Sequence, residues 1–210
     1  WSFMGPPGFE ECIVTPLVAN LTDDNGDGKI DLCDVPDVVV VAGPNVGSDT
    51  PPARLYVLDG ATGAVHFFAS ELVQWGATPA LGDIDGDGRA ELVAGMSGLR
   101  SGLIAVLDDA RAGFALHPVN RTGRPWYPVE PSASTSMSGG MTVPALGDLD
   151  GDGRAELVVG FGSGSRGRLA VLEDAVVGWP TSVSGISILT TGRSSYQSRD
   201  GAARPALGDV

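Results

Sequence analysis

The sequence predicts an all-β protein made of β-propeller-type blades, each with about four antiparallel strands. An acidic, glycine-rich motif recurs at intervals of about 60 residues, which is typical of blade repeats. An apolar run of strand length follows each copy of the motif. The 31 glycines and 15 prolines favour a turn-rich β protein, and no segment shows sustained helical periodicity.

Each repeat reads as a small antiparallel sheet. The second repeat contains "TPALGDIDGDGRAELVAG" (Thr78 to Gly95), and the third contains "VPALGDLDGDGRAELVVG" (Val143 to Gly160). In both, "PALGD" predicts a short first strand, and the acidic loop turns the chain into a second strand that is buried on both faces. The runs "LIAVLDD" and "RLAVLED" predict third strands, and a less regular segment supplies a fourth.

The repeats divide the whole chain. We expect one repeat domain or propeller fragment over 1–210, with three full repeats and the start of a fourth. The expected bounds are approximately 13–76, 77–141 and 142–203, with a partial repeat at 204–210, where the motif begins again as "RPALGDV".

The acidic loop of the second repeat carries oxygen ligands on alternate residues. The side chains of Asp83, Asp85 and Asp87 are followed by the backbone carbonyl of Arg89 and the carboxylate of Glu91. Carboxylates this close repel one another unless a cation neutralises them. Ca²⁺ accepts about six to eight oxygen ligands and tolerates irregular geometry better than Mg²⁺. The alternative is a solvated acidic turn, but recurrence of the motif favours a structural Ca²⁺ site.

The other two loops extend this prediction. The third loop repeats the spacing with Asp148, Asp150, Asp152, Arg154 and Glu156. The first loop follows the twelve-residue EF-hand pattern without flanking helices, with candidate ligands Asp23, Asn25, Asp27, Lys29 (through its carbonyl), Asp31 and Asp34. Because this loop is longer, Asn20 and Asp37 correspond to Asp83 and Glu91, and the sequence leaves open whether either touches an ion.

Two cysteines, Cys12 and Cys33, lie in the first third of the chain. A disulfide between them would fasten the first acidic loop and would imply an oxidising compartment. Two buried free thiols are the alternative. The two histidines, His66 and His117, show no metal-ligand spacing relative to the cysteines, so a zinc site is not expected.

Charge and motif content exclude several function classes. Acidic residues outnumber basic ones by 26 to 13, and this surface would repel nucleic acid and anionic membranes. No stretch reaches the roughly 20 apolar residues of a membrane span. No nucleophile–base motif occurs, and His66 and His117 read as packed or exposed side chains. We therefore expect no enzymatic activity.

Aromatic residues offer a candidate ligand site. Trp126 and Tyr127 lie in the non-repeating segment "GRPWYPVEP", which has loop composition, and could stack on a sugar. Trp75 and Trp179 recur at similar places in their repeats, and we expect them to pack between blades.

The acidic motif resembles the FG-GAP, or integrin-α-like, repeat. "DIDGDGRAELVAG" and "DLDGDGRAELVVGFGSG" carry the family motif, and Phe161 and Gly162 stand where the family name places its Phe-Gly. The resemblance implies propeller blades with Ca²⁺ in the hairpin loops. It implies an extracellular calcium-binding protein with a structural, adhesive or self-assembling role. The alternative is a lectin-like glycan-binding module of a larger secreted protein or polysaccharide-acting enzyme.

Assembly and location follow from the same resemblance. Family members usually close a ring of seven blades, which three repeats and a fraction cannot do, and open sheet edges are normally avoided. We therefore expect partner strands from further chain or from other copies, as a homo-oligomer or a head-to-tail filament. An extracellular glycan or protein is a further expected partner. The expected location is extracellular or at the cell surface. Arginine far outnumbers lysine, which occurs only at Lys29, and this favours a bacterial source.

Overall fold

All regular elements of the described chain are β-strands, so the predicted all-β class is confirmed. The computed structural model describes residues 1–44, 52–69, 73–97, 103–110, 112–115, 126–128, 142–149, 151, 153–163, 166–172, 197–198 and 205. Within this part of the chain, no helix has the length and hydropathy needed to cross a membrane.

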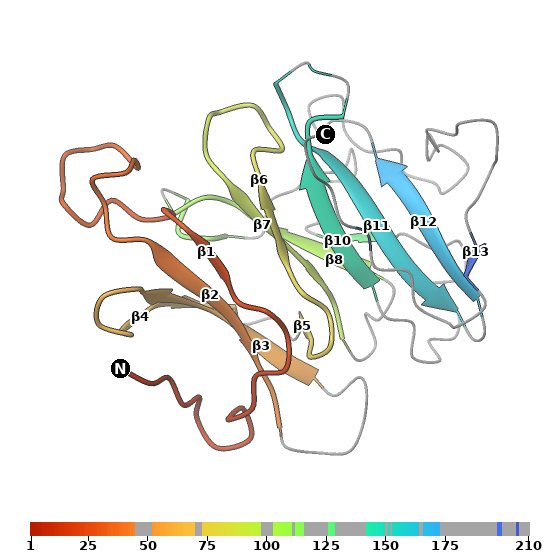
Figure 1. Ribbon diagram of the computed structural model, residues 1–210, viewed down its shortest axis with the longest axis horizontal. Helices are drawn as coiled ribbons and strands as arrows, with labels where there is room; N and C mark the ends of the chain where they lie inside the picture. The colour runs from red at the N-terminus through yellow and green to blue at the C-terminus, as the bar shows by residue number, and fades with distance from the viewer. Residues whose placement is uncertain are drawn as a thin grey trace.

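The strands form three antiparallel sheets that lie side by side (Figure 1). The first sheet has the order β1 (Leu17–Ala19), β2 (Asp37–Ala42), β3 (Pro52–Asp59) and β4 (Val65–Phe68), with β5 (Val73–Gln74) also paired to β3. The second sheet has the order β6 (Ala80–Gly82), β7 (Glu91–Gly95), β8 (Leu103–Leu107) and β9 (Trp126–Pro128). The third has the order β10 (Thr142–Gly147), β11 (Glu156–Ser163), β12 (Arg166–Leu172) and β13 (Gln197–Ser198).

Each sheet contains a four-stranded meander in which consecutive strands pair, the connectivity expected for a blade, and β5 is added to the first sheet through β3. The sheets fall within the three predicted repeats. Of the predicted fourth repeat, only Pro205 lies among the described residues. The acidic loops join the first two strands of each sheet, and Figure 1 shows all three loops at the same end of the stack.

The sheets pack against one another through alternate faces of their strands. Leu92 and Ala94 of β7 belong to a buried cluster with residues of the first sheet. Gly95 of β7 faces the third sheet, because a Cβ atom built on it would lie 2.2 Å from the carbonyl oxygen of Thr142. Gly82 of β6 is packed as closely, since its Cβ would lie 2.9 Å from that of Leu146. The second sheet is therefore sandwiched between the other two, and glycine permits this close approach.

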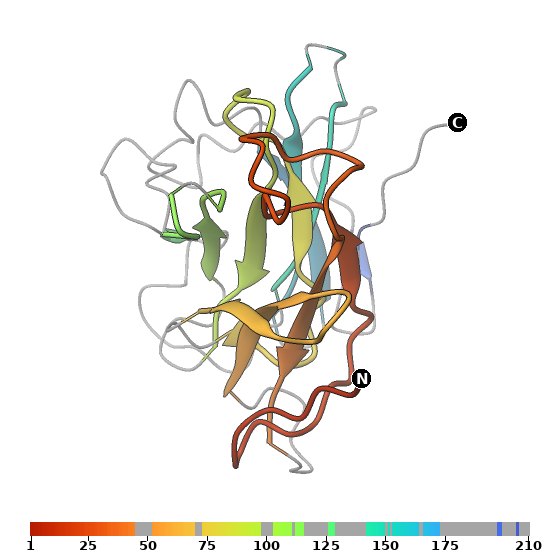
Figure 2. The same ribbon diagram turned by 90° about the vertical axis from the view of Figure 1, so that its left-hand side faces the viewer.

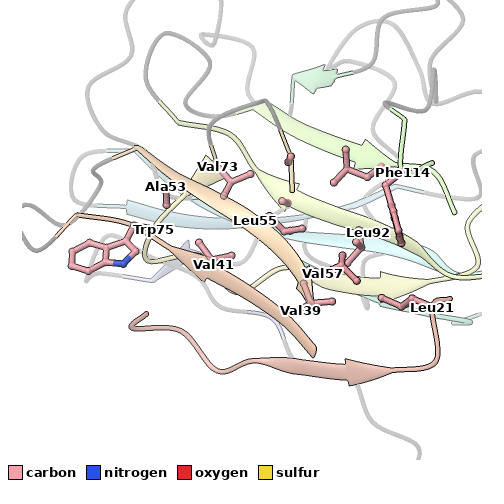
Figure 3. Packing of buried hydrophobic residues seen from close by; sticks show 13 residues of the cluster. Leu21, Val39, Val41, Ala53, Leu55, Val57, Val73, Trp75, Leu92 and Phe114 are labelled. Atoms are coloured by element: carbon pink, nitrogen blue, oxygen red, sulfur yellow. The ribbon is translucent and has the colours of Figure 1, made fainter. Parts of the chain in front are cut away.

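The main core fills the space between the first and second sheets (Figure 3). Val39 and Val41 of β2 point the same way because side chains alternate along a strand. They pack with Leu55 and Val57 of β3 against the second sheet. Trp75 is buried at one end of this cluster, where its indole N–H donates to the carbonyl of Glu11 at 3.0 Å. Trp179 lies outside the described residues.

The N-terminal segment packs on the opposite face of the first sheet. Phe3 contacts Tyr56 with ring centroids 5.0 Å apart, and the guanidinium of Arg54 lies over the ring of Phe9. The indole N–H of Trp1 donates to the carbonyl of Gly60 at 2.9 Å. Figure 2 views the stack from the side of the first sheet, with this segment in red. The chain thus covers an apolar face that would otherwise be open.

Candidate metal centre

In each of the three acidic loops, the carboxylate of the first aspartate accepts hydrogen bonds from backbone N–H groups of the described residues that follow it. In the second loop, the Asp83 carboxylate accepts hydrogen bonds from the backbone N–H groups of Gly86, Asp87 and Gly88 at 2.7, 3.1 and 2.8 Å. Gly86 and Gly88 have φ of 82° and 85°, which glycine adopts readily. The curled loop brings the side chain of Asp85 close to that of Asp83.

The same bonds recur in the other loops. Asp23 accepts from Gly26, Asp27 and Gly28, and Asp148 accepts from Gly151 and Gly153. The loops of the first and third sheets therefore begin with the turn seen in the second.

In the second loop, the side chains of Asp83, Asp85 and Glu91 converge. Each offers one carboxylate oxygen, and these three oxygens lie within 4.8 Å of one another. Asp83 follows β6 directly, whereas Glu91 opens β7. A cation held by these residues would join the two strands at the mouth of the hairpin.

Glu91 is the most informative member of this group. Its side chain is 1% exposed, and its Oε2 accepts a hydrogen bond from the Ile84 N–H at 2.6 Å. Its Oε1 is buried and has no hydrogen-bond partner among the described residues. A buried carboxylate oxygen without a partner is strongly unfavourable. A cation between Glu91, Asp83 and Asp85 would remove this penalty, so the residues present fit a metal site.

The environment of Glu91 disfavours its charge. Burial is the largest effect, and the carboxylates of Asp85, Asp83 and Asp87 act in the same direction. The hydrogen bond from Ile84 opposes them, and the net result raises the pKa of Glu91 from 4.5 to about 8. Between these two pKa values, the Glu91 carboxyl is therefore protonated in the metal-free folded state and ionised in the unfolded state.

This proton gives the metal-free chain a defined pH dependence. Between pH 4.5 and about 8 the folded state binds more protons at Glu91 than the unfolded state, so its contribution to stability falls as pH rises. Urea unfolding of the chelator-treated chain at about pH 5 and about pH 8.5 checks this, and Glu91→Gln is expected to flatten the change. An unchanged pH slope in Glu91→Gln would contradict the assignment.

Asp87 and Arg89 make side-chain contacts that the sequence did not predict. Asp87 lies outside the group of three, and its Oδ2 accepts a hydrogen bond from Arg89 Nη1 at 2.9 Å. The same Nη1 donates to Asp109 at 3.0 Å. The Arg89 side chain thus links the loop to the end of β8. The predicted metal contact of Arg89 was through its backbone carbonyl, and nothing in the structure tests it.

The third loop is described in part. Glu156 is buried and accepts from the Leu149 N–H at 2.5 Å, which matches the bond between Glu91 and Ile84. Asp150 and Asp152 lie outside the described residues. Arg154 packs against the second loop, because a Cβ on Gly86 would lie 2.9 Å from its Nε. Neighbouring loops are therefore in contact.

In the first sheet, a different carboxylate, Asp37, lies at the position that Glu91 occupies in the second sheet. Asp37 pairs with Ala19 as Glu91 pairs with Gly82, so Asp37 takes the place of Glu91. It is 0% exposed, but the Leu21 and Thr22 N–H groups donate to its carboxylate at 3.0 Å each. The Nδ1 of His66 lies 3.0 Å from the other oxygen. Protein groups thus satisfy Asp37 without a cation.

In the first loop, backbone N–H groups donate to the predicted ligands Asp27, Asp31 and Asp34. Asp34 is buried and accepts from the N–H groups of Asp24, Asn25 and Asp31. Asp31 accepts from the Cys33 N–H at 2.8 Å, and Asp27 accepts from the Lys29 N–H at the same distance. Within the described chain, Asp23, Asp27, Asp31 and Asp34 form no group of three converging ligands.

The two cysteines are free in this structure, and both are exposed. The predicted disulfide is therefore not formed. Cys33 instead bonds to Asp31 through its backbone and its side chain, and the latter contact raises the pKa of its thiol. The alternative of buried thiols does not hold either, since both residues are exposed.

Trp126 and Tyr127 lie on a strand rather than in a loop. They belong to β9 and pair with Ala105 and Ile104 of β8. The non-repeating sequence around them had suggested a loop, but pairing along the edge of β8 places them in the outer strand. Their proposed sugar contact is not tested by this placement. His117 lies outside the described residues.

One cluster escaped the sequence analysis. His66 lies close to Asp24 and Asp59, although Asp24 is far from the other two in the chain and the three have no recognisable ligand spacing. Only strand pairing between β3 and β4, together with the fold of the first loop, brings them together.

Comparison with known proteins supports one repeat directly. Residues 142–172 match the family model of the FG-GAP repeat. The biofilm matrix protein Bap1 of V. cholerae has a similar solved structure, with 21% sequence identity and a TM-score of 0.46. The alignment covers 88% of this chain but only 42% of that protein. No curated relative matches the chain. The predicted FG-GAP repeat is thus confirmed for residues 142–172, which span β10 to β12 and the third acidic loop.

Proposed function

We propose that this chain is a calcium-stabilised extracellular repeat module with a structural or adhesive role. The buried, unpartnered Oε1 of Glu91 beside Asp83 and Asp85 is the observation that carries the calcium assignment. All three donors are carboxylate oxygens, which suit a hard cation. The ion would brace the β6–β7 hairpin, and this is a structural rather than a catalytic use.

The extracellular role rests on the FG-GAP match and on charge. FG-GAP repeats suggest an extracellular setting, where modules bind Ca²⁺ with dissociation constants of about 10⁻⁴ to 10⁻³ M. The net charge of −13 disfavours nucleic acid as a partner. The proposed partners are other copies of the chain or an extracellular glycan or protein. The proposal includes no enzymatic activity.

Calcium titration tests this function. Stabilisation by a ligand at a hundred times its dissociation constant is about 2.7 kcal/mol. For a domain of this size, this raises the melting temperature by about 5–11 °C. We expect Ca²⁺ to produce a rise of this order in the metal-stripped chain, and Mg²⁺ to produce less. Asp85→Asn should reduce the calcium effect, whereas Asp108→Asn, outside the acidic loop, should not.

The same titration, followed by light scattering, addresses assembly. A mass that rises with protein concentration in Ca²⁺ would support self-assembly. A constant mass together with saturable glycan binding would favour the lectin-like alternative. If Ca²⁺ leaves the melting temperature unchanged, the calcium proposal is wrong.

A further inference from the structure

A second cluster of metal-ligating side chains lies on the first sheet, away from the second acidic loop. The Nε2 of His66 is 3.9 Å from Asp24 Oδ1 and 3.8 Å from Asp59 Oδ2. These separations are too long for hydrogen bonds. Both fall inside about 4.4 Å, twice the metal–ligand distance, which is the largest separation of two donor atoms on one Zn²⁺. The ligand atoms of all three residues lie within 4.8 Å of one another, so they form a candidate group of ligands for one ion.

The imidazole of His66 is oriented for this task by a residue outside the cluster. Its Nδ1 lies 3.0 Å from the Oδ1 of Asp37, which is fully buried. When Nδ1–H donates to Asp37, the lone pair of a neutral imidazole is on Nε2, which faces Asp24 and Asp59. A carboxylate behind a ligating histidine is the usual arrangement in zinc sites. Asp37 would therefore be a positioning residue rather than a ligand.

Three separate segments supply the ligands. Asp24 belongs to the first acidic loop, Asp59 ends β3, and His66 lies on β4. Asp59 is held in place because its Oδ1 accepts hydrogen bonds from the backbone N–H and hydroxyl of Thr62 at 2.5 and 2.7 Å. The three side chains are partly exposed, so an ion can enter and water can complete its coordination.

We propose that Asp24, Asp59 and His66 bind a transition-metal ion of the Zn²⁺ class. The imidazole nitrogen distinguishes this site from the acidic loops, since Ca²⁺ and Mg²⁺ prefer ligand sets made entirely of oxygen. The ion would fasten the first loop to the β3–β4 hairpin. The site does not depend on the calcium proposal, which concerns Asp83, Asp85 and Glu91.

Zinc titration by calorimetry, in excess Ca²⁺, tests the site. The exposed Cys12 and Cys33 could also bind zinc, so the titration uses the full chain with Cys12→Ser and Cys33→Ser. We expect one Zn²⁺ per chain. Asp24→Asn, an isosteric change in an exposed loop, should weaken binding at least about 10-fold. His66→Gln should weaken it as much or more, whereas His117→Gln should leave it unchanged.

The alternative is a protonated imidazole paired with the surrounding aspartates, and it predicts no zinc binding. Absence of binding in the cysteine-free chain would overturn the proposal. Zinc binding that is unchanged in both Asp24→Asn and His66→Gln would also overturn it. Loss of zinc binding in His117→Gln would do the same. Since His66→Gln also removes the contact with Asp37, a folding defect in that variant leaves Asp24→Asn as the deciding measurement. Because the zinc titration is run in excess Ca²⁺, any calcium site is already filled. The zinc result therefore does not depend on whether the calcium proposal is correct.

Discussion

Glu91→Gln is expected to stabilise the calcium-free chain at about pH 8.5 and to remove the calcium effect of the second loop. Without metal, the substitution replaces a buried carboxylate whose Oε1 finds no hydrogen-bond partner in the part of the chain that the structure describes. The amide oxygen can still accept from the Ile84 N–H, and the new NH₂ group can donate to Asp83 or Asp85. With Ca²⁺, the variant lacks the buried charged ligand, so a contribution of up to about 2.7 kcal/mol at a hundredfold excess over the dissociation constant disappears.

Glu91→Gln is expected to raise stability without Ca²⁺ and to remove the stabilisation that Ca²⁺ provides. These opposite effects distinguish a metal ligand from a residue that only stabilises the fold. Melting curves of the wild type and Glu91→Gln, each with Ca²⁺ and with chelator, give the four necessary values. Glu10→Gln is the matched control, since Glu10 is exposed and its carboxylate accepts the local N–H of Gly8. A variant that is less stable than wild type in both conditions would show that Glu91 stabilises the fold without metal.

Leu92→Ala is expected to lower the free energy of unfolding by about 2–5 kcal/mol. Leu92 is 0% exposed and belongs to the cluster between the first and second sheets, with Leu55 and Val57 opposite (Figure 3). Truncation removes buried methyl groups and leaves a cavity, because strands on both sides restrict collapse. The loss should appear in urea unfolding with Ca²⁺ present.

Leu32→Ala is the matched control for this substitution. Leu32 is 97% exposed in the first loop, so the same chemical change should alter stability by less than about 0.5 kcal/mol. If the two variants were equally stable, the second sheet would not be packed on the first as described. A calcium-induced rise in melting temperature that persists in Leu92→Ala would show that packing and metal binding contribute separately.

Repeating patterns made much of the fold predictable. The alternation of acidic loops with apolar runs predicted the strands on either side of each loop, because strand pairing across a short loop depends on nearby residues. The same local spacing predicted Asp83, Asp85 and Glu91 as neighbours, and it identified Glu156 as the counterpart of Glu91. The corresponding positions of Asn20 and Asp37 agree with the pairing of Ala19 and Asp37.

Local sequence patterns could not predict contacts between segments that are distant in the chain. The sequence alone could not show that His66 would reach Asp37, or that Arg89 would hold Asp87 and Asp109 together. The first loop follows an EF-hand spacing, yet its carboxylates mostly accept from its own backbone. Their orientation depends on which N–H groups the folded loop leaves without partners, and spacing does not report this.

The sequence by itself therefore determined the class of fold, the repeat order and the second acidic loop as a candidate metal centre. These features depend on interactions among residues that are close along the chain. The tertiary structure decided which carboxylate remains buried without a partner and which is already satisfied. Glu91 and Asp37 occupy equivalent positions, but His66 from another strand supplies the missing partner only to Asp37. Side chains from other strands thus distinguish the two positions, because the partners of a buried charge come from whatever the fold packs around it.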